Sequence, residues 1–282
     1  MAFRAEQPAT TIPTDEPILK ARNLSFAYSS GRLVVNGVSL ALQRGRMAAL
    51  LGANGSGKST LIRLLAGILL PSAGEVLLSG KAIHRIPRIP LARTLAYVPQ
   101  LNPLSFPFTA LEVVLAGRSP HVPRFQFENC LDFEKAWTAL ETVGVAHLAQ
   151  RPVTELSGGE RQLVVFARAI AQAPECLLLD EPSASLDLKH RAELIRNLVR
   201  LRDRMNLTVL LVTHDVPLLD DSFDVVFAMR AGAILTEGKP SEVLTSDVLS
   251  SVYEDPHLQS RNVEGRTFVW SATHRGAADD KE

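Results

Sequence analysis

A short glycine-rich segment of the chain has the composition of a phosphate-binding loop. Residues 52–59 read GANGSGKS and fit the pattern GxxxxGK(S/T). Glycines let successive backbone N–H groups wrap the β- and γ-phosphates of a nucleotide, Lys58 adds a positive charge, and the Ser59 hydroxyl is suited to bind Mg²⁺. The segment lies between an apolar run and a helical pattern, as this mechanism requires. We therefore predict that nucleotide phosphates are bound by Gly52, Ala53, Asn54, Gly55, Ser56, Gly57, Lys58, Ser59 and Thr60.

Two acidic residues follow an apolar run further along the chain. Residues 176–179 read CLLL, and Asp180 and Glu181 come directly after them. This pattern predicts a buried strand that delivers two carboxylates at its carboxyl end, where ligands bind in open α/β sheets. Neighbouring strand residues point to opposite faces, so Asp180 is expected to serve Mg²⁺ and Glu181 to polarise the attacking water. Alone the pattern also fits a surface turn, but together with the phosphate loop it favours a catalytic site.

A histidine occupies a comparable position at the end of another apolar run. His214 follows residues 208–213, TVLLVT, on the edge where the acidic pair is expected. The other six histidines have no such placement and are interpreted as structural. We therefore count His214 among the candidate catalytic residues.

The segment LSGGERQ, at residues 156–162, begins a helical pattern with two adjacent glycines. Ser157 and Glu160 fit a capping box, which satisfies two backbone donors at a helix start. The capping box leaves Gly158 and Gly159 unexplained, since each glycine costs about 0.5–1 kcal/mol relative to alanine in a regular element. These glycines indicate that bare backbone is needed at this position.

Strand-like and helix-like patterns alternate along most of the chain. Strand-like runs extend from Ile18 to Gln43, and a continuous apolar run at residues 47–51 leads into the glycine-rich loop. Later apolar runs alternate with helical patterns, which indicates an α/β class with a mostly parallel sheet covered on both faces. From about residue 103 the alternation of strand-like and helix-like runs gives way to helical patterns. The amphipathic run LDFEKAWTALETVGV in this part predicts a helical insertion.

The composition limits the possible classes of protein. The chain has 282 residues and is 46% hydrophobic, which is enough for a full core. Its 30 Lys and Arg residues balance 30 Asp and Glu residues, which argues against a nucleic-acid partner. Cys130 and Cys176 lack metal-ligand spacing and suit a reducing compartment.

The sequence also sets expectations about membranes and chain ends. Residues 1–17 lack the apolar segment of a signal peptide and are expected to form a flexible leader. No segment has the uninterrupted apolar length needed to cross a bilayer. We therefore expect a soluble protein whose role at a membrane comes through a partner.

The glycine-rich loop, LSGGERQ and CLLLDEP, in that order, resemble the ATP-binding subunit of an ABC transporter. The resemblance extends from about Ile18 to beyond Gly238. It implies a P-loop NTPase core with a mostly parallel sheet, an N-terminal antiparallel β subdomain and a helical insertion subdomain. Within this fold, residues 18–245 would form the ATP-binding domain, with the insertion at about 103–170, and residues 246–282 a C-terminal extension of short helix, strand and flexible tail.

The resemblance also implies a homodimer that uses ATP and Mg²⁺. In this family the signature loop of one subunit closes over the γ-phosphate held by the P-loop of the other. Ser157, Gly158 and Gly159 would then present a hydroxyl, bare amides and a helix dipole to a nucleotide bound by the partner. A side chain at either glycine would obstruct that approach.

Four further residues resemble functional positions of the family. Tyr28 lies where an aromatic side chain stacks on adenine. Gln100 resembles the glutamine that contacts Mg²⁺ and reports to the helical insertion, Asp187 the aspartate that crosses the dimer interface, and His214 the switch histidine at the γ-phosphate. Leu163 stands where many relatives carry arginine or glutamine, a difference on the helix surface that affects no chemical position.

Two segments are similar to a subgroup of importers. FTALEVVLAGRSPH, at residues 108–121, and the sequence of residues 243–270, with a helix ending in Val-Tyr and a final short strand, are similar to importers of ferric siderophores, haem and cobalamin. The expected partners are permease subunits in the membrane and a periplasmic or surface substrate-binding protein. The expected location is the cytoplasmic face of the inner membrane.

Other functions remain open at this point. Importers of molybdate or of zinc and manganese are the nearest competitors. A non-transport ABC ATPase of DNA repair or translation would carry long coiled coils, zinc modules or a second cassette, and none of these patterns occurs in the sequence. A P-loop kinase would have no use for LSGGERQ.

Overall fold

The centre of the molecule is a six-stranded sheet whose apolar strands are buried. The computed structural model describes residues 16–29, 31–100, 106–184 and 186–272; the expected flexible leader and tail lie mainly outside these ranges. The strand order is β10-β9-β3-β8-β7-β6, with parallel neighbours except at the β9–β10 edge. The strands are β3 (Met47–Gly52), β6 (Leu95–Val98), β7 (Cys176–Asp180), β8 (Thr208–Thr213), β9 (Val225–Arg230) and β10 (Ala233–Gly238).

The register of this sheet brings three strand ends together. Leu51 of β3 pairs with Thr213 of β8, and Asp180 of β7 pairs with Val212 of β8. Every residue of β3, β7 and β8 is buried, as expected for parallel strands covered on both faces. The residues that follow these strands therefore lie at one edge of the sheet.

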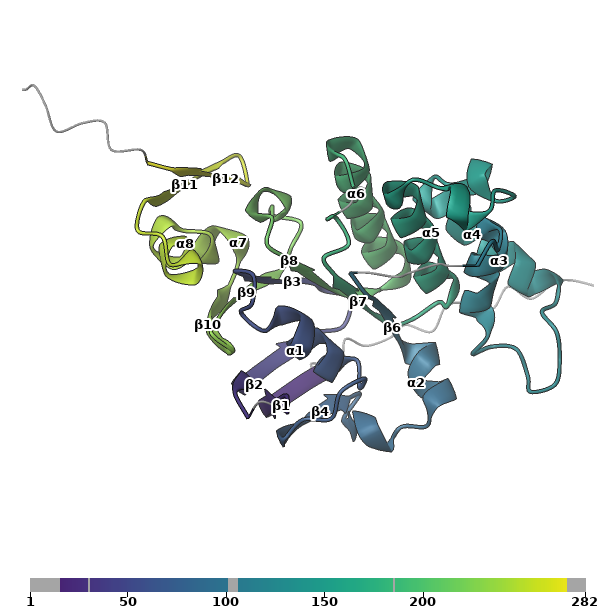
Figure 1. Cartoon of the computed structure of the whole chain (residues 1–282), viewed down its shortest axis with the longest axis horizontal. Helices are drawn as coiled ribbons and strands as arrows, with labels where there is room; N and C mark the ends of the chain where they lie inside the picture. The colour runs from purple at the N-terminus through teal and green to yellow at the C-terminus, as the bar shows by residue number, and fades with distance from the viewer. Residues whose placement is uncertain (1–15, 30, 101–105, 185, 273–282) are drawn as a thin grey trace, which may run out of the picture.

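A second sheet packs beside the first and is antiparallel throughout. Its order is β2-β1-β4-β5, and its apolar side chains share one core with α1 and the nearer face of the central sheet. Figure 1 shows α1 above these strands, between them and the central sheet. The elements are β1 (Leu19–Ala27), β2 (Leu33–Leu42), α1 (Lys58–Leu65), β4 (Ala73–Leu78) and β5 (Lys81–Ala82).

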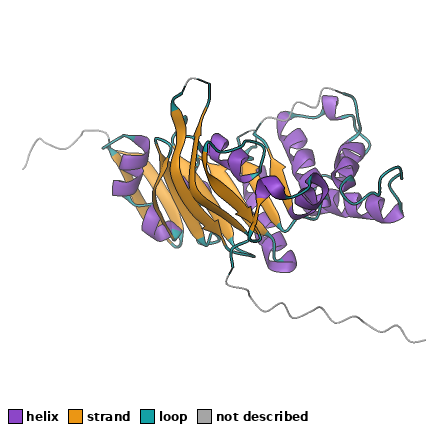
Figure 2. Cartoon of the chain, turned by 90° about the horizontal axis from the view of Figure 1, so that it is seen from below, coloured by secondary structure: helices purple, strands orange, loops and turns teal. Residues whose placement is uncertain are grey.

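The helical insertion gathers at the opposite end of the molecule from the C-terminal strands (Figure 2). A buried ion pair helps to hold it, because Arg118 Nε lies 3.1 Å from Asp132 Oδ1 and Arg118 Nη1 donates to the carbonyl of Ala171 at 2.8 Å. Capping boxes begin two of its helices, at Thr109 and, as predicted, at Ser157. The helices are α3 (Ala110–Leu115), α4 (Cys130–Val143) and α5 (Gly158–Ala171).

The parallel sheet, the antiparallel N-terminal sheet and the helical insertion together confirm the expected fold class.

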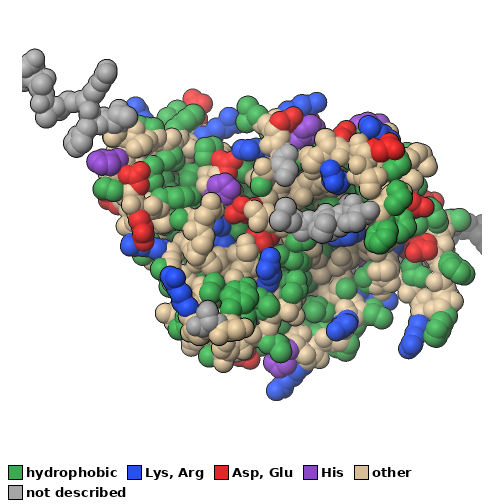
Figure 3. Space-filling model, in the orientation of Figure 1, with side chains coloured by type: hydrophobic (Ala, Val, Ile, Leu, Met, Phe, Trp, Pro, Cys, Tyr) green, Lys and Arg blue, Asp and Glu red, His purple; other side chains and the backbone are tan. Residues whose placement is uncertain are grey.

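Acidic and basic side chains are interspersed over the face drawn in Figure 3, in keeping with the balanced composition. In the part of the chain that the structure describes, no helix combines the length and apolar character needed to span a membrane. The other helices before the C-terminal extension are α2 (Arg88–Thr94), α6 (Leu188–Met205), α7 (Pro240–Val243) and 3₁₀ turns at Ile83–Arg85, Ala116–Arg118, Ala146–Leu148, Val153–Glu155 and Val216–Leu218.

The C-terminal extension differs in one respect from the expectation. Its helix α8 (Ser246–Tyr253) ends in Val-Tyr as expected, but two strands follow it instead of one. β11 (Leu258–Val263) and β12 (Arg266–Ser271) form an antiparallel hairpin. The first strand, LQSRNV, is mostly polar, so it lacks the apolar alternation by which a strand is found in a sequence.

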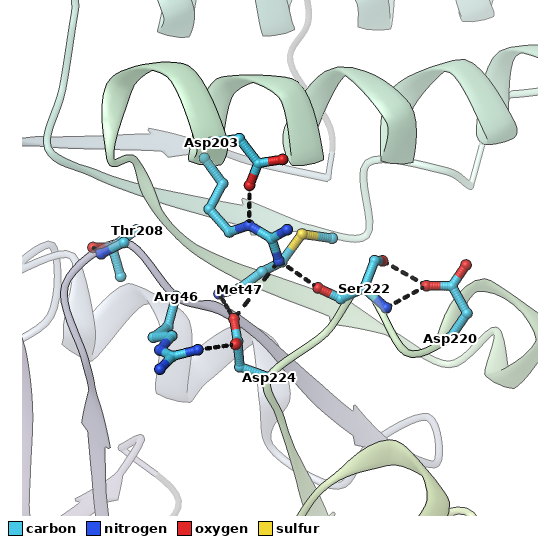
Figure 4. Close-up of polar contacts among 9 residues, drawn as sticks. Arg46, Met47, Asp203, Thr208, Asp220, Ser222 and Asp224 are labelled. Atoms are coloured by element: carbon cyan, nitrogen blue, oxygen red, sulfur yellow. Dashed lines mark hydrogen bonds and ion pairs between the residues drawn. The ribbon is translucent and has the colours of Figure 1, made fainter. Parts of the chain in front are cut away.

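A cluster of polar contacts lies at the edge of the central sheet where the parallel strands begin (Figure 4). Asp224 accepts hydrogen bonds from Arg46 Nη1 at 2.6 Å and from the backbone N–H of Met47 at 2.8 Å. Arg202 of α6 donates to the carbonyl of Ser222 at 2.7 Å and lies 3.8 Å from Asp224. Met47 begins β3, so this cluster fixes the strand that carries the glycine-rich loop at its other end.

Replacing Asp224 with alanine should lower the free energy of unfolding by about 1–3 kcal/mol, because a backbone N–H and an arginine lose a charged partner. Urea denaturation measures the change. The matched control is Asp203→Ala, which also removes a partner of Arg202 but a carboxylate that is 58% exposed. The control should lose less than about 0.5 kcal/mol. An equal loss in the two variants would contradict the role given to Asp224.

Candidate nucleotide-binding site

Two glycines of the 52–59 loop lie where no side chain fits. A Cβ atom at Gly52 would lie 2.6 Å from the carbonyl oxygen of Met229, and one at Gly57 would lie 2.4 Å from that of Val34. Gly57 also has φ +104°, a conformation that disfavours other residues. The loop thus connects β3 to α1 with its backbone pressed against two neighbouring strands and its other side open.

Lys58 is the first residue of α1 and its side chain folds back into the loop. Its Nζ donates to the carbonyls of Gly52 at 2.9 Å and Ala53 at 3.0 Å, and lies 3.8 Å from Glu181 Oε1. Burial lowers the pKa of Lys58, whereas the charges of Glu181 and Asp180 act in the opposite direction. The loop carbonyls and the acidic pair therefore hold a cation at the place where the pattern predicts phosphate binding.

A cavity of about 480 Å³ opens beside this loop, at the edge where β3, β7 and β8 end. Its volume lies within the usual range for small-molecule sites. Polar groups from segments far apart in the sequence converge on it, as is typical of ligand sites in parallel sheets. It is lined by Val34, Asn54, Gly55, Gly57, Lys58, Ser59, Thr60, Gln100, Glu181, Ala184 and His214.

Asp180 lies behind the loop and is fully buried. The Ser59 hydroxyl donates to its Oδ1 at 3.1 Å, and the Tyr97 hydroxyl donates to its Oδ2 at 3.3 Å. Burial raises the pKa of Asp180, although the hydrogen bond from Ser59 and the charge of Arg63 oppose this shift. Tyr97 is a site residue that sequence reasoning missed; a hydroxyl inside the apolar strand before Gln100 was the available signal.

These oxygen atoms fit a hard cation together with phosphate. The Ser59 hydroxyl and the Asp180 carboxylate are adjacent, and oxygen ligands of this kind suit Mg²⁺. The Oγ of Ser56, in the loop itself, is buried and has no hydrogen-bond partner among the described residues. Within the same residues no group of three or more His, Cys, Asp or Glu side chains could hold a metal ion.

Glu181 has different partners from its neighbour Asp180. Gln100 Nε2 donates to its Oε2 at 3.0 Å, and His214 Nδ1 lies 3.3 Å from the same oxygen. Its backbone has φ +48°, an uncommon conformation for a residue with a side chain. Backbone strain of this kind persists only where the surrounding contacts hold the residue in place, and strained residues are common at functional sites. The turn directs the Glu181 carboxylate toward Lys58, Gln100 and His214.

Tyr28 follows β1 and contacts the helix that begins in the loop. Its hydroxyl lies 3.2 Å from Thr60 Oγ1, and its ring meets that of Phe26 edge-on at a centroid distance of 4.9 Å; the residue as a whole is 44% exposed. The exposed ring is available for stacking. Adenine binding by Tyr28 stays a prediction.

Ser157, Gly158, Gly159 and Asp187 are not among the residues that line the cavity. Ser157 caps α5 as expected, since its Oγ accepts from the N–H of Glu160 at 3.2 Å while its own N–H donates to Glu160 Oε2 at 2.8 Å. Asp187 caps α6, and its Oδ1 accepts from the N–H of His190 at 2.9 Å. One chain therefore brings together the phosphate loop, the acidic pair, Gln100 and His214, but leaves these four residues elsewhere.

A parallel sheet with a phosphate loop and two acidic residues at its carboxyl edge defines a P-loop nucleotide hydrolase. The sequence profile of the ABC transporter family matches residues 35–184. The chain belongs to the ABC transporter family, in which it is an ATPase.

Several relatives carry the names of import ATP-binding proteins. The chain is 37% identical over 236 residues to the iron(3+)-hydroxamate import protein FhuC of Bacillus subtilis, covering 84% of this chain and 87% of FhuC. It is 39% identical over 257 residues to the hemin import protein HmuV of Nocardia farcinica, covering 90% and 88%. It is also 39% identical to the cobalamin import protein BtuD of Halobacterium salinarum, over 80% of this chain and 56% of BtuD.

Solved structures share the fold. An inward-facing ABC transporter described as of metal-chelate type has a TM-score of 0.76 and 30% identity, covering 91% of this chain and 97% of that chain. A dimeric ATP-binding cassette in a post-hydrolysis state with ADP and phosphate has a TM-score of 0.70 and 26% identity, covering 79% and 98%.

Replacing Glu181 with glutamine should lower ATP turnover by roughly 10²- to 10⁴-fold, because the amide keeps the shape but cannot act as a base. ATP affinity should stay within a few fold, since Lys58 and the loop are intact. Phosphate release and nucleotide-binding titrations measure the two quantities. The matched control is Glu175→Gln at the other end of β7, where the carboxylate pairs with Arg44 at the surface. Normal turnover in Glu181→Gln would remove this residue as the base.

Proposed function

We propose that the chain is the ATP-hydrolysing subunit of an importer that takes up a metal chelate, namely a ferric siderophore, haem or cobalamin, through a membrane permease. The carrying observation is that relatives covering most of the chain are import proteins for these three cargo types. The fold neighbour of metal-chelate type supports the same class. The proposal places the protein at the cytoplasmic face of the inner membrane, bound to its permease.

The polar residues in and around the cavity have proposed parts in ATP hydrolysis. The loop amides and Lys58 bind the β- and γ-phosphates, and Tyr28 stacks on adenine. Ser59, Asp180 and Gln100 would hold Mg²⁺, which neutralises charge on the phosphate oxygens. Among the carboxylates, Glu181 is the one that accepts a proton from the attacking water, because it reaches the cavity while Asp180 is bonded behind the loop.

His214 completes the site from β8. Its Nδ1 lies 3.3 Å from Glu181 Oε2, so the imidazole orients the proposed base. Gln100 bonds the same carboxylate oxygen at 3.0 Å. Two polar contacts thus hold the proposed base before it takes a proton from the attacking water.

The site of one chain is proposed to be completed by a second copy. Ser157 and Gly158 are exposed at the start of α5, and Asp187 is exposed at the start of α6. A helix start with free amides is suited to bind an anion, and these residues do not line the cavity of their own chain. In the proposed homodimer they act on the nucleotide of the partner, which accounts for the two bare glycines.

The permease is proposed to contact the helical insertion. Gln100 donates a hydrogen bond to Glu181 and precedes this insertion in the sequence, and within the insertion Phe106 and Phe108 expose 69% and 55% of their surface. A permease that favours the closed dimer raises turnover only by its differential affinity for that state. A periplasmic or surface binding protein delivers the cargo, and the balanced charge supports no role for nucleic acid.

An Asp introduced at Gly158 tests the proposed role of the partner subunit. The thermal midpoint should hardly change, since an acidic residue at a helix start contributes about 0.3–1 kcal/mol of stabilisation. ATPase activity should fall by at least about tenfold, because like charges meet across the interface. Cys130→Asp, at the equivalent first position of α4, is the matched control and should retain activity. In mixed dimers with Lys58→Ala, one site carries both defects and the other should still bind ATP; loss of both would contradict the proposal.

The cargo is tested by reconstitution with the cognate permease in vesicles. ATPase activity should rise when a binding protein loaded with a ferric siderophore, haem or cobalamin is added, because loaded binding protein favours the closed state. Unloaded binding protein is the control. Stimulation by molybdate- or zinc-loaded protein, with none by any chelate, would support the alternative metal importers. Purification with DNA and without a permease would support a non-transport ATPase.

A further inference from the structure

The C-terminal extension reaches the residue that follows β8. Helix α8 ends at Tyr253, and the hydroxyl of this residue donates a hydrogen bond to the backbone carbonyl of His214 at 2.9 Å. A carbonyl oxygen can only accept, so the direction of this bond is settled by chemistry. The phenol is half-buried between the extension and the loop after β8. The extension is thus bonded to the main chain of a proposed catalytic residue.

The side chain of His214 has little packing of its own. It is 49% exposed, and its Nδ1 lies 3.3 Å from Glu181 Oε2. An exposed ring has few neighbours that would exclude its other rotamers. Its orientation is therefore set chiefly by the position of its backbone and by the few polar contacts that it makes. The position of the His214 main chain therefore decides whether the imidazole meets Glu181.

Other contacts hold the loop after His214 on both sides. Asp215 lies 2.8 Å from Arg191 of α6, and its N–H donates to Thr213 Oγ1 at 2.9 Å. Further along, the backbone of Asp220 forms an isolated antiparallel β-bridge with that of Arg266 of β12. The loop is accordingly fastened to α6 on one side and to the extension on the other, and Tyr253 is the contact at His214 itself.

Burial raises the pKa of Tyr253 to about 12, and the charges of Asp215 and Glu181 act in the same direction. The phenol therefore stays protonated at neutral pH and remains a hydrogen-bond donor.

We propose that Tyr253 is a positioning residue for ATP hydrolysis: its hydrogen bond to the His214 carbonyl fixes the main chain so that the imidazole faces Glu181. The proposal rests on the role given to His214 under the proposed function. It assigns the C-terminal extension a part in the reaction through the loop after β8.

The test compares Tyr253→Phe with Ser250→Ala. The first removes only a hydroxyl and keeps the ring. The second, on the same helix, removes a hydrogen bond to the carbonyl of Leu258, within the extension. Tyr253→Phe should lower kcat by roughly three- to tenfold, equivalent to one neutral hydrogen bond, with KM for ATP unchanged within about twofold. Ser250→Ala should leave kcat unchanged.

A spectroscopic measurement separates positioning from stability. In ¹H–¹³C spectra of histidine-labelled protein, the His214 signal is identified by its loss in His214→Ala. Tyr253→Phe should move or broaden this signal and leave that of His147 in place, while Ser250→Ala should change neither. An unchanged His214 signal, an unchanged kcat, or an equal loss in Ser250→Ala would each overturn the proposal.

The same variants distinguish the failure of this inference from that of the proposed function. If His214→Ala itself retains full kcat, the catalytic role of His214 fails and the present inference fails with it. If His214→Ala is slow but Tyr253→Phe is normal, only the role of Tyr253 is overturned.

Discussion

The carboxylate of Glu181 is the point on which the rest of the site depends. It is nearly buried, and it meets Lys58 from the glycine-rich loop, Gln100 from the segment after β6 and His214 from the segment after β8. A buried carboxylate is tolerated only with such partners, because its desolvation is costly. The parallel strands that end at one edge supply those partners, and the left-handed turn at Glu181 directs the carboxylate toward them.

The adjacent carboxylate shows how one strand end serves two purposes. Asp180 is the last residue of β7 and is held by Ser59 and Tyr97 behind the loop. Because the chain turns directly after it, Glu181 enters the cavity instead of following its neighbour. Two identical functional groups, adjacent in sequence, thus acquire different surroundings from one change of backbone direction: Asp180 is hydrogen-bonded behind the loop and Glu181 faces the cavity.

The fold places two outer parts, the helical insertion and the C-terminal extension, around the cavity. The cavity is built from the two sheets and α1. The C-terminal extension reaches it from outside, because Tyr253 donates a hydrogen bond to the carbonyl of His214, whose side chain contacts Glu181. Gln100, which precedes the helical insertion in the sequence, donates to the same carboxylate.

Local features were determined by the sequence itself. The glycine-rich loop, the acids after an apolar strand, the capping boxes at Thr109 and Ser157 and the α/β class all follow from neighbouring residues, whose spacing and backbone preferences act over a few positions. The family resemblance supplied Gln100, and a strand end supplied His214. Their roles in catalysis, like those of Tyr28, Ser157, Gly158, Gly159 and Asp187, stay predictions.

Only the tertiary structure decided which of these residues meet. The contacts of Glu181 with Lys58 and Gln100, of Asp180 with Tyr97, and of His214 with Tyr253 join residues at least 39 positions apart. They depend on strand order and register, which are set by the burial of whole faces and are not readable from any single segment. The polar strand β11 was missed for a related reason: it exists through pairing with β12, and its own residues carry no apolar pattern that would indicate it.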